Sequence, residues 1–402
     1  MKGYVFAFLG LVTACDSSGT VAGAPDGSTD ALPADATADA GNAGPDPCAD
    51  AGVPPTSLAC TGLYADIATK QLAPGAAAYT PATPLWSDNA QKARWIELPP
   101  NTRIDISHPS EWTFPVGTKV FKEFRVDGKR VETRMFQKTT STFWVYATYA
   151  WNSDDSAATI NYGGLVPVGG DGGTWKIPSN DDCNDCHKGR QDRILGFEQV
   201  GLGLPGAQGL TLAELAARGL VTPAPASTTL TVGNDGTGLD GLALAWVHVN
   251  CGVTCHNSNP SAAGFGAAML LRLDPTQLDG RAPNATWDVL RTTVGVPCVS
   301  GSVQGQPRIV PGDAADSVLY QLMDERGALQ MPPIASLLVD VPDVAVVRAW
   351  IQGMSPADGG TNTDAAGTPD AGDGGLPGDG GQSDAQADAG APDGMSDDDA
   401  GD

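Results

Sequence analysis

Residues 119–136 have the sequence KVFKEFRVDGKRVETRMF, and this stretch decides the fold class of the first half of the chain. Apolar and charged residues are mixed along 119–126 and along 130–136 in the manner of strands. Asp127-Gly128 between them favours the positive φ angles of a tight hairpin turn. The stretch therefore predicts two antiparallel strands joined by a two-residue turn.

The flanking sequence extends this β pattern over residues 58–180. Residues 143–151 form a run of β-branched and aromatic residues, which predicts another strand. We expect an antiparallel β domain of the sandwich type. Its tryptophans are expected in the core, with a sugar-stacking surface as the alternative. They are Trp86, Trp95, Trp112, Trp144 and Trp151.

The pattern becomes helical from residue 181 to residue 354. Residues 211–219 carry an N-capping Thr, a Glu three positions later and a terminal Gly. Two further helices are expected at 239–250 and 343–353. Their buried faces are Leu242, Ala245, Trp246 and Val249 in the first, and Val344, Val347, Trp350 and Ile351 in the second. The predicted fold class is α+β, with an antiparallel β-sandwich-like domain followed by an α-helical domain.

The first chemical motif is the CxxCH at Cys183-Asn184-Asp185-Cys186-His187. Two thiols at this spacing can add to the vinyl groups of one haem, and the adjacent His then ligates the iron. With eight Cys and four His in 402 residues, roughly 0.002 such matches are expected by chance. A redox disulfide needs a βαβ context and a zinc site needs further ligands, and the sequence offers neither. Cys183, Cys186 and His187 are therefore predicted to hold haem c.

The second motif, Cys251-Gly252-Val253-Thr254-Cys255-His256, is a CxxxCH with one extra residue. Two interpretations are open. In the first, a second haem is held by Cys251, Cys255 and His256. In the second, one of the two thiols pairs with Cys298 in a structural disulfide. The preceding helix and a downstream Met favour the haem.

That Met is Met331, in Gln330-Met331-Pro332-Pro333. A loop Met followed by Pro is typical of the sixth ligand of a cytochrome c, because Pro stiffens the loop. Ordinary core packing is the alternative. The order of helix, CxxxCH, Met-Pro-Pro and a closing helix near Met354 is that of a class I cytochrome c. It predicts a cytochrome c-like domain over 181–354 with Met331 as an iron ligand.

His248 lies one helical turn before Cys251, so it cannot easily ligate the same iron as His256. Two roles are open for it: the sixth ligand of the first haem, or a buried His near haem propionates. No Met lies between His187 and His248 that would compete for the first role. We expect the first haem to lie between the β domain and the helical domain.

The N-terminus carries the features of an export signal. Met1-Lys2 is followed by an apolar run over 4–14, which together predict a signal peptide over 1–15. Val12-Thr13-Ala14-Cys15 resembles the bacterial lipobox and predicts lipidation of Cys15; an ordinary signal peptide that contains a Cys is the alternative. We expect an exported protein that is lipid-anchored to a bacterial membrane, in the periplasm or at the cell surface.

The net charge of −24 is concentrated at the two ends of the chain. Residues 16–57 contain seven Asp and residues 355–402 contain twelve, with neither Lys nor Arg, so both are predicted to be disordered. Residues 58–354 contain 22 basic and 28 acidic residues. This balance disfavours nucleic acid as a partner, because phosphate binding needs a basic surface. In an exported protein Cys48 and Cys60 are expected to form a disulfide, which leaves Cys298 over.

The motifs resemble a family of secreted diheme c-type cytochrome-like proteins, most of them without a characterised function. The resemblance covers most of 58–353 and rests on Thr61–Tyr64, Pro84–Asp88, Phe114–Thr118, Glu132–Arg134, Cys183–His187, His248–His256, Pro311–Asp313 with Ser317, and Met331–Pro333. It implies electron transfer through covalently bound haem, with Cys183, Cys186, His187, Cys255 and His256 carried over by motif. The family pattern at the second site is CxxCH, so the role of Cys251 stays open.

These features together predict a lipid-anchored diheme c-type cytochrome that passes single electrons to a redox partner protein. Such a carrier needs no acid–base pair, because the cofactor supplies the chemistry. One alternative is a haem peroxidase or oxidase with an open coordination position. Another is a β domain that binds a ligand while the haem is structural.

Overall fold

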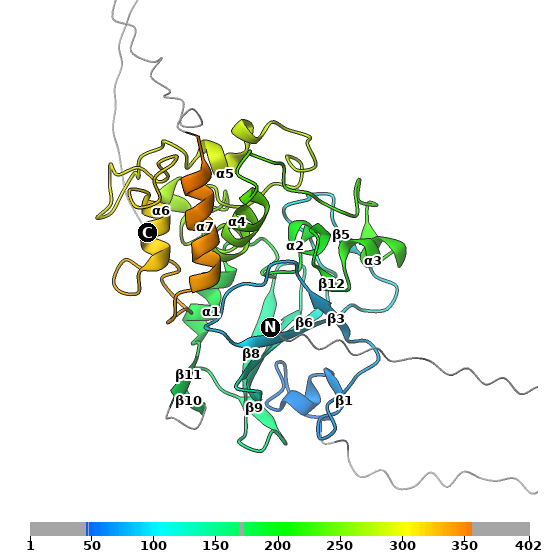
Figure 1. The fold of residues 1–402 in the computed structure, drawn as a ribbon. Helices are drawn as coiled ribbons and strands as arrows, with labels where there is room; N and C mark the ends of the chain where they lie inside the picture. Colours follow the sequence, from blue (N-terminus) through cyan, green and yellow to red (C-terminus); the bar gives the residue numbers. More distant parts are fainter. Residues whose placement is uncertain (1–45, 47, 169–172, 356–402) are drawn as a thin grey trace, which may run out of the picture. The chain divides into compact units, whose positions relative to one another are not determined.

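The computed structural model describes residues 46, 48–168 and 173–355, which form an α+β fold around one large antiparallel sheet (Figure 1). The mixed α+β class is thus as predicted. In spatial order the seven strands are β12 (Gln208–Gly209), β3 (Ala77–Thr80), β4 (Gln91–Glu97), β6 (Lys119–Val126), β7 (Lys129–Lys138), β8 (Trp144–Trp151) and β9 (Ala158–Ile160).

The predicted hairpin forms the centre of this sheet. β6 and β7 are joined at Asp127 and Gly128, whose φ angles are 51° and 78°. The turn therefore has the two positive φ angles that a tight hairpin requires. β8 confirms the strand expected at 143–151 and pairs with β7 from Trp144 to Ala150.

Three small two-stranded sheets complete the β structure of the described residues. β1 (Tyr64–Asp66) pairs with β2 (Gln71–Leu72), and β10 (Gly164–Val168) pairs with β11 (Gly173–Ile177). β5 (Ile104–Asp105) pairs in parallel with β13 (Val221–Thr222). None of them is a second large sheet facing the first, so the described part of the chain does not have the layers of a sandwich.

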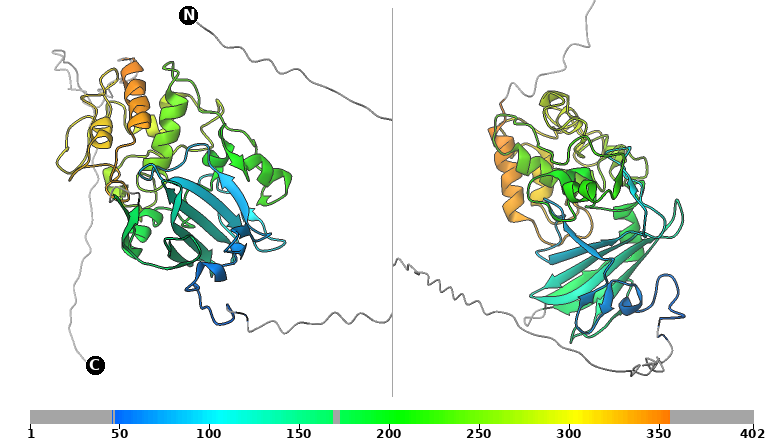
Figure 2. Two further views of the ribbon diagram at one scale, coloured as in Figure 1. Left: turned by 60° about the horizontal axis from the view of Figure 1, so that its bottom comes forward. Right: turned by 90° about the vertical axis from the view of Figure 1, so that its right-hand side faces the viewer.

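The two faces of the large sheet are instead covered by short segments, as the two views of Figure 2 show. On one face, Trp95, Phe121 and Met135 pack against the segment that contains Leu58 and Leu63. On the other face, a cluster formed by strand residues such as Ile96, Val120 and Phe136 includes Phe197, Leu202, Leu212 and Leu215. Residues 194–221 therefore belong to the packing of the sheet, although their sequence is helical in pattern.

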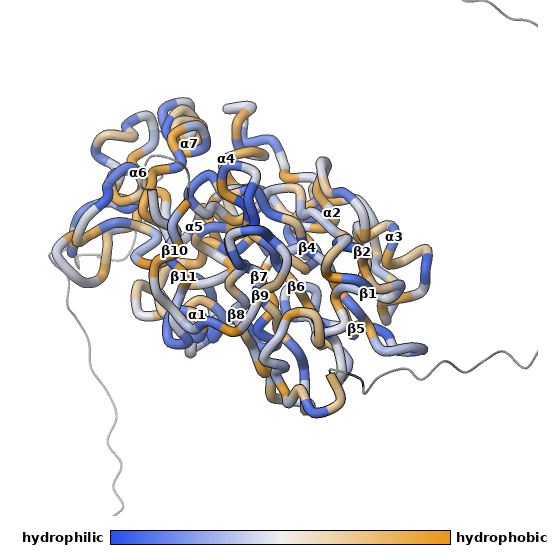
Figure 3. Tube along the Cα trace, turned by 90° about the horizontal axis from the view of Figure 1, so that it is seen from below, coloured by the Kyte–Doolittle hydropathy of each residue, from blue (hydrophilic) through white to orange (hydrophobic). Residues whose placement is uncertain are grey.

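The helices are short except for the last. They are η1 (Leu58–Cys60), α1 (Asn180–His187), α2 (Gln199–Gly203), α3 (Leu212–Ala217), α4 (Asp240–Val247), the π-helical turn η2 (His248–Gly252), η3 (Phe265–Ala267), η4 (Asn284–Thr286), α5 (Asp288–Arg291), α6 (Val318–Asp324) and α7 (Val341–Gly353). Hydrophobic and hydrophilic residues are interleaved along the chain (Figure 3), and no helix in the described ranges has the length and apolar composition needed to cross a bilayer.

The predicted helices are confirmed with one correction to a buried face. Thr211 caps α3, and α7 buries Val344, Val347, Trp350 and Ile351 as expected. In α4, however, Leu242 is 66% exposed. The packing of α4 against α7 uses the face that contains Trp246, so Leu242 faces away from the core.

The aromatic residues of the β region serve mainly as core. Trp95, Trp112, Trp144 and Trp151 are buried, and only Trp86 is partly accessible. Four of the five tryptophans thus have no face free for stacking on a sugar.

The signal peptide, Cys15, and most of the predicted linker and tail lie outside the described residues. The linker ends earlier than expected, because residues 53–57 are held by the sheet region. Tyr149 donates a hydrogen bond to the Pro55 carbonyl at 2.9 Å, and Ser57 forms a β-bridge with Thr159.

A buried ion pair next to the sheet yields a stability prediction. Asp192 accepts hydrogen bonds from Lys138 at 2.7 Å, from Trp144 at 2.8 Å and from the Phe114 amide at 2.6 Å. Asp192→Ala leaves the Lys138 ammonium, 1% exposed, without its counter-charge. We expect a loss of about 3–5 kcal/mol in the free energy of unfolding, measured by urea denaturation.

Asp185→Ala is the matched control, because Asp185 pairs with Lys188 at the surface. Its cost should stay within about 1 kcal/mol. Equal costs for the two variants would contradict the role given to Asp192.

Candidate functional site

The CxxCH motif lies on α1. Ser179 accepts a hydrogen bond from the Asp182 amide, and Asp182 accepts one from the Ser179 amide, which makes a complete capping box. This helix was not predicted from the sequence, although Ser179-x-x-Asp182 is its signal. Because α1 ends at His187, the last residue of the motif sits at the helix end.

His187 is held in the orientation of a ligand. Its Nδ1 lies 2.5 Å from the Arg193 carbonyl oxygen. Since a carbonyl only accepts, Nδ1 carries the proton and Nε2 keeps its lone pair. The ring stacks on Phe136 with centroids 4.2 Å apart. Burial lowers the pKa of His187 to about 3, so the imidazole is neutral at physiological pH.

His187 and Cys186 line a cavity of about 600 Å³, which we call the sheet cavity. This volume lies within the range of cofactor-binding pockets. Its walls come from β6 and β7, from the β10–β11 hairpin, from α1 and from the loop 330–338; they include Lys122, Arg134, Phe136, Trp175, Asp182 and Leu337. Cys183 is buried in α1 and does not belong to this lining.

The CxxxCH motif begins in the π-helical turn η2, which continues α4. The Val253 amide donates to the His248 carbonyl at 2.8 Å, and the His256 amide donates to the Cys251 carbonyl at 2.9 Å. Both bonds span five residues, whereas an α-helical bond spans four. Cys251 and His256 are thus separated by one wider turn. This turn accommodates the residue by which CxxxCH is longer than CxxCH.

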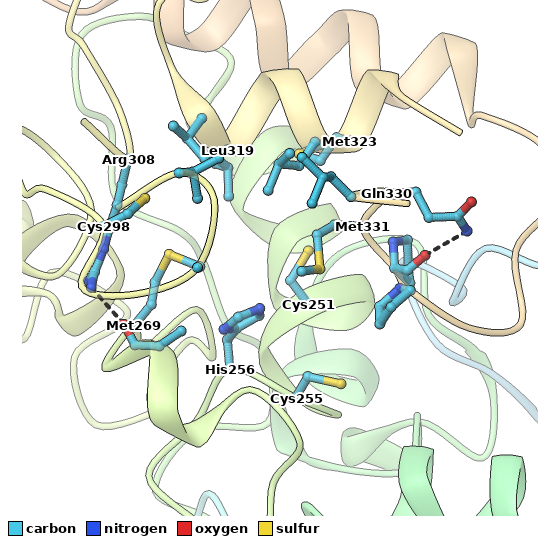
Figure 4. A pocket seen from close by; sticks show the side chains of 18 of the residues that line it. Cys251, Cys255, His256, Met269, Cys298, Arg308, Leu319, Met323, Gln330 and Met331 are labelled. Atoms are coloured by element: carbon cyan, nitrogen blue, oxygen red, sulfur yellow. Dashed lines mark hydrogen bonds between the residues drawn. The ribbon is translucent and has the colours of Figure 1, made fainter. Parts of the chain in front are cut away.

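Cys251, Cys255 and His256 line a second cavity of about 380 Å³, which we call the helical cavity (Figure 4). Met331 lines the same cavity, as its predicted role requires. The other labelled residues around it are Met269, Cys298, Arg308, Leu319, Met323 and Gln330.

Backbone contacts position the segments that carry His256 and Met331, while Nδ1 of His256 is buried without a hydrogen-bond partner among the described residues. A Cβ at Gly264 would lie 2.8 Å from Nδ1 of His256, so this position admits no larger residue. Burial lowers the pKa of His256 to about 4. The Met331 amide donates to the Leu322 carbonyl at 2.8 Å, and Gln330 donates to the carbonyls of Pro332 and Ser336.

The cysteines divide into two groups. Cys48 and Cys60 are disulfide-bonded, as expected. Cys183, Cys186, Cys251, Cys255 and Cys298 are free, so the alternative pairing of Cys298 with a motif thiol is not formed. Burial raises the pKa of Cys186 and of Cys251 to about 12. The pKa values of these thiols are far above those of the thiolates that carry out disulfide exchange.

His248 does not occupy the position of a ligand. It is 1% exposed and lines neither of the two cavities described above. Its Nδ1 accepts a hydrogen bond from the Leu273 amide at 2.9 Å, and its Nε2 faces Glu198 at 3.4 Å. Since both ring nitrogens are engaged, the geometry does not support His248 as the sixth ligand of the first haem.

The two motifs lie against each other. A Cβ at Gly189 would lie 2.1 Å from the Thr254 carbonyl oxygen, so the end of α1 touches the backbone of the CxxxCH motif. The two cavities share lining residues, which are Asn250, Cys255, Gln330, Pro332 and Pro333. The sheet cavity is lined by residues of both the β region and the helical region, and the first haem expected between these regions stays a prediction.

No group of three or more His, Cys, Asp or Glu side chains is arranged around a bare metal ion in residues 48–168 and 173–355. Haem iron needs fewer protein ligands, because the porphyrin supplies the equatorial ones. One His per motif, with Met331 at the second cavity, fits this requirement.

A substitution at Gly252 tests the packing of the π-helical turn. A Cβ there would lie 2.3 Å from the Arg272 amide nitrogen and 2.4 Å from the Leu271 carbonyl carbon. Gly252→Ala must push the turn away from this backbone, and we expect a loss of about 1–3 kcal/mol in thermal unfolding. Gly241→Ala in α4 is the control, because nothing lies within 4 Å of its Cβ. That variant should be neutral or more stable by up to about 1 kcal/mol.

Comparison of the chain with protein-family models, with curated proteins and with solved structures found no match, so the assignment below rests on the residues themselves.

Proposed function

We propose that this protein is a c-type cytochrome that carries two haems and transfers single electrons. The observation that carries the proposal is that each motif brings a neutral His and at least one free thiol to a cavity of cofactor size, with His187 partly buried and His256 buried. Bound haem supplies reversible one-electron chemistry. The chain positions the iron ligands and excludes water from them.

At the first site, Cys183 and Cys186 would hold the cofactor and His187 would ligate its iron through Nε2. The bond from Nδ1 to the Arg193 carbonyl supports this role, because it orients the ring and makes the free nitrogen more basic. At the second site, Cys251, Cys255 and His256 would play the same parts. Met331 would be the opposite ligand and would raise the potential.

A second candidate function is a peroxidase-type reaction at the first site. Among the described residues that line the sheet cavity there is neither a Met nor a second His besides His187. A position opposite His187 would then stay open to a small ligand. A high-spin signal at rest together with reaction with peroxide would favour this enzyme over a simple carrier.

The sequence features at the ends of the chain support a cellular location for this activity. We propose that the chain is exported and held at a bacterial membrane through lipid on Cys15. Its partner would be another redox protein of the same compartment, since single electrons need a donor and an acceptor.

The proposal is tested by counting covalent haem. The full chain, produced with haem-attachment machinery, should contain two haems in the pyridine haemochrome assay and in intact mass. Cys183→Ser with Cys186→Ser should leave one, and Cys251→Ser with Cys255→Ser should also leave one. Cys298→Ser is the control and should keep both. A wild-type chain without haem contradicts the proposal.

Met331→Leu tests the second axial ligand. The substitution keeps the volume and removes the thioether, so the higher of the two midpoint potentials should fall. Met269→Leu, in the wall of the same cavity, should leave that potential unchanged. If only Met269→Leu lowers it, the ligand has been assigned to the wrong methionine.

A further inference from the structure

Three neighbouring strands place cations directly opposite one another. In the register of the sheet, Arg94 on β4 faces Lys122 on β6, and Lys122 faces Arg134 on β7. Directly paired residues lie on the same face of a sheet. Like charges in such pairs are destabilising, so this cationic row has a cost within the protein alone.

The row is poorly neutralised by the rest of the described chain. Arg134 pairs with the buried carboxylate of Glu132, yet its Nε has no hydrogen-bond partner. Arg94 and Lys122 form no ion pair with any described residue, and Arg94 is buried. Lys92 lies on the next row and donates to the Leu85 carbonyl at 2.5 Å. Among the described residues, these four cations therefore have one carboxylate within ion-pair distance, that of Glu132, while Asp340 and Asp88 act on Lys92 from farther away.

Two members of the row reach the sheet cavity. Lys122 and Arg134 line it together with Cys186 and His187. Both are supported by Phe124, whose ring centre lies 5.0 Å from Nζ of Lys122 and 4.3 Å from Cζ of Arg134. Burial and the neighbouring cations lower the pKa of Lys122 well below its usual value, which an anion placed beside it would reverse.

We propose that Lys122 and Arg134, backed by Arg94 and Lys92, form a binding site for a pair of carboxylates inside the sheet cavity. The inference rests on the proposed function, in which the carboxylates are the two propionates of the haem held by Cys183, Cys186 and His187. A free dicarboxylate has the same chemistry and is the other source that the test must separate. Such a site explains why the chain carries the cationic row although the repulsion between its charges is destabilising.

Lys122→Met in the full haem-loaded chain is the main test. It removes a charge near the iron without breaking an ion pair, so haem attachment should be retained. Without this cation the reduced form is less stable. We expect the equilibrium constant for reduction of the first haem to fall about tenfold, which lowers its midpoint potential by ~59 mV for one electron. The propionate bending band in resonance Raman spectra should shift as well, since it reports the hydrogen bonding of these carboxylates.

Two variants serve as matched controls. Lys129→Met removes an exposed charge from the same hairpin and should change neither signal. Lys122→Arg should restore both signals towards wild type. If Lys122→Met fails to fold, Lys92→Met provides the second variant, with a smaller fall in the same direction. Signals for Lys122→Met that match those of Lys129→Met overturn the carboxylate site and leave the haem assignment intact.

A wild-type chain without haem would instead defeat the proposed function. In that case calorimetric titration with succinate separates the two sources. Binding to wild type that Lys122→Met abolishes supports a site for a free dicarboxylate. Absence of succinate binding overturns the site itself.

Discussion

The backbone contact between Gly189 and Thr254 is the constraint on which the arrangement of the candidate site depends. It requires a residue without a side chain at the end of α1, because any Cβ would overlap the Thr254 carbonyl. The contact brings two motifs that are about 65 residues apart in sequence into one region. In the same region Cys186 is partly buried and lies close enough to Cys255 for that thiol to raise its pKa. The sheet cavity and the helical cavity consequently share a wall.

The two cavities differ in the chemistry of their walls. The helical cavity contains the sulfur atoms of Met269, Met323, Met331 and Cys298. The sheet cavity contains the cations of β6 and β7. Under the proposed function, soft ligation at one site and charge at the other are different means of setting a potential. In a protein with two such sites, the potential of each haem can be set independently of the other.

The sequence predicted the elements whose signals are local. The hairpin at 119–136 follows from alternation and from Asp127-Gly128, and α7 follows from a helical period of apolar residues. It did not predict how the sheet is covered, because the strands β12 and β13 and the helices α2 and α3 are too short to reveal their partners. Their association with β3 and β5 depends on contacts between distant residues.

The site residues divide in the same way. Spacing alone pointed to the thiols and histidines of both motifs, and the loop sequence pointed to Met331; the structure places all of them except Cys183 at the two cavities, and their role as haem ligands stays a prediction. The sequence left two roles open for His248, and it could not decide between them because its partners Glu198 and Leu273 lie 50 and 25 residues away in the chain. The cationic row was not visible either, because opposition of Arg94, Lys122 and Arg134 exists only in the paired sheet.

The π-helical turn at His248–Gly252 decides where His256 lies relative to Cys251. A residue inserted into an α-helix normally rotates everything beyond it by about 100°, which would turn His256 away from its cavity. A turn that widens by one residue absorbs the insertion locally and leaves the following chain in phase. In this chain the imidazole of His256 therefore reaches the same cavity as the thiol of Cys251, although five positions separate the two residues.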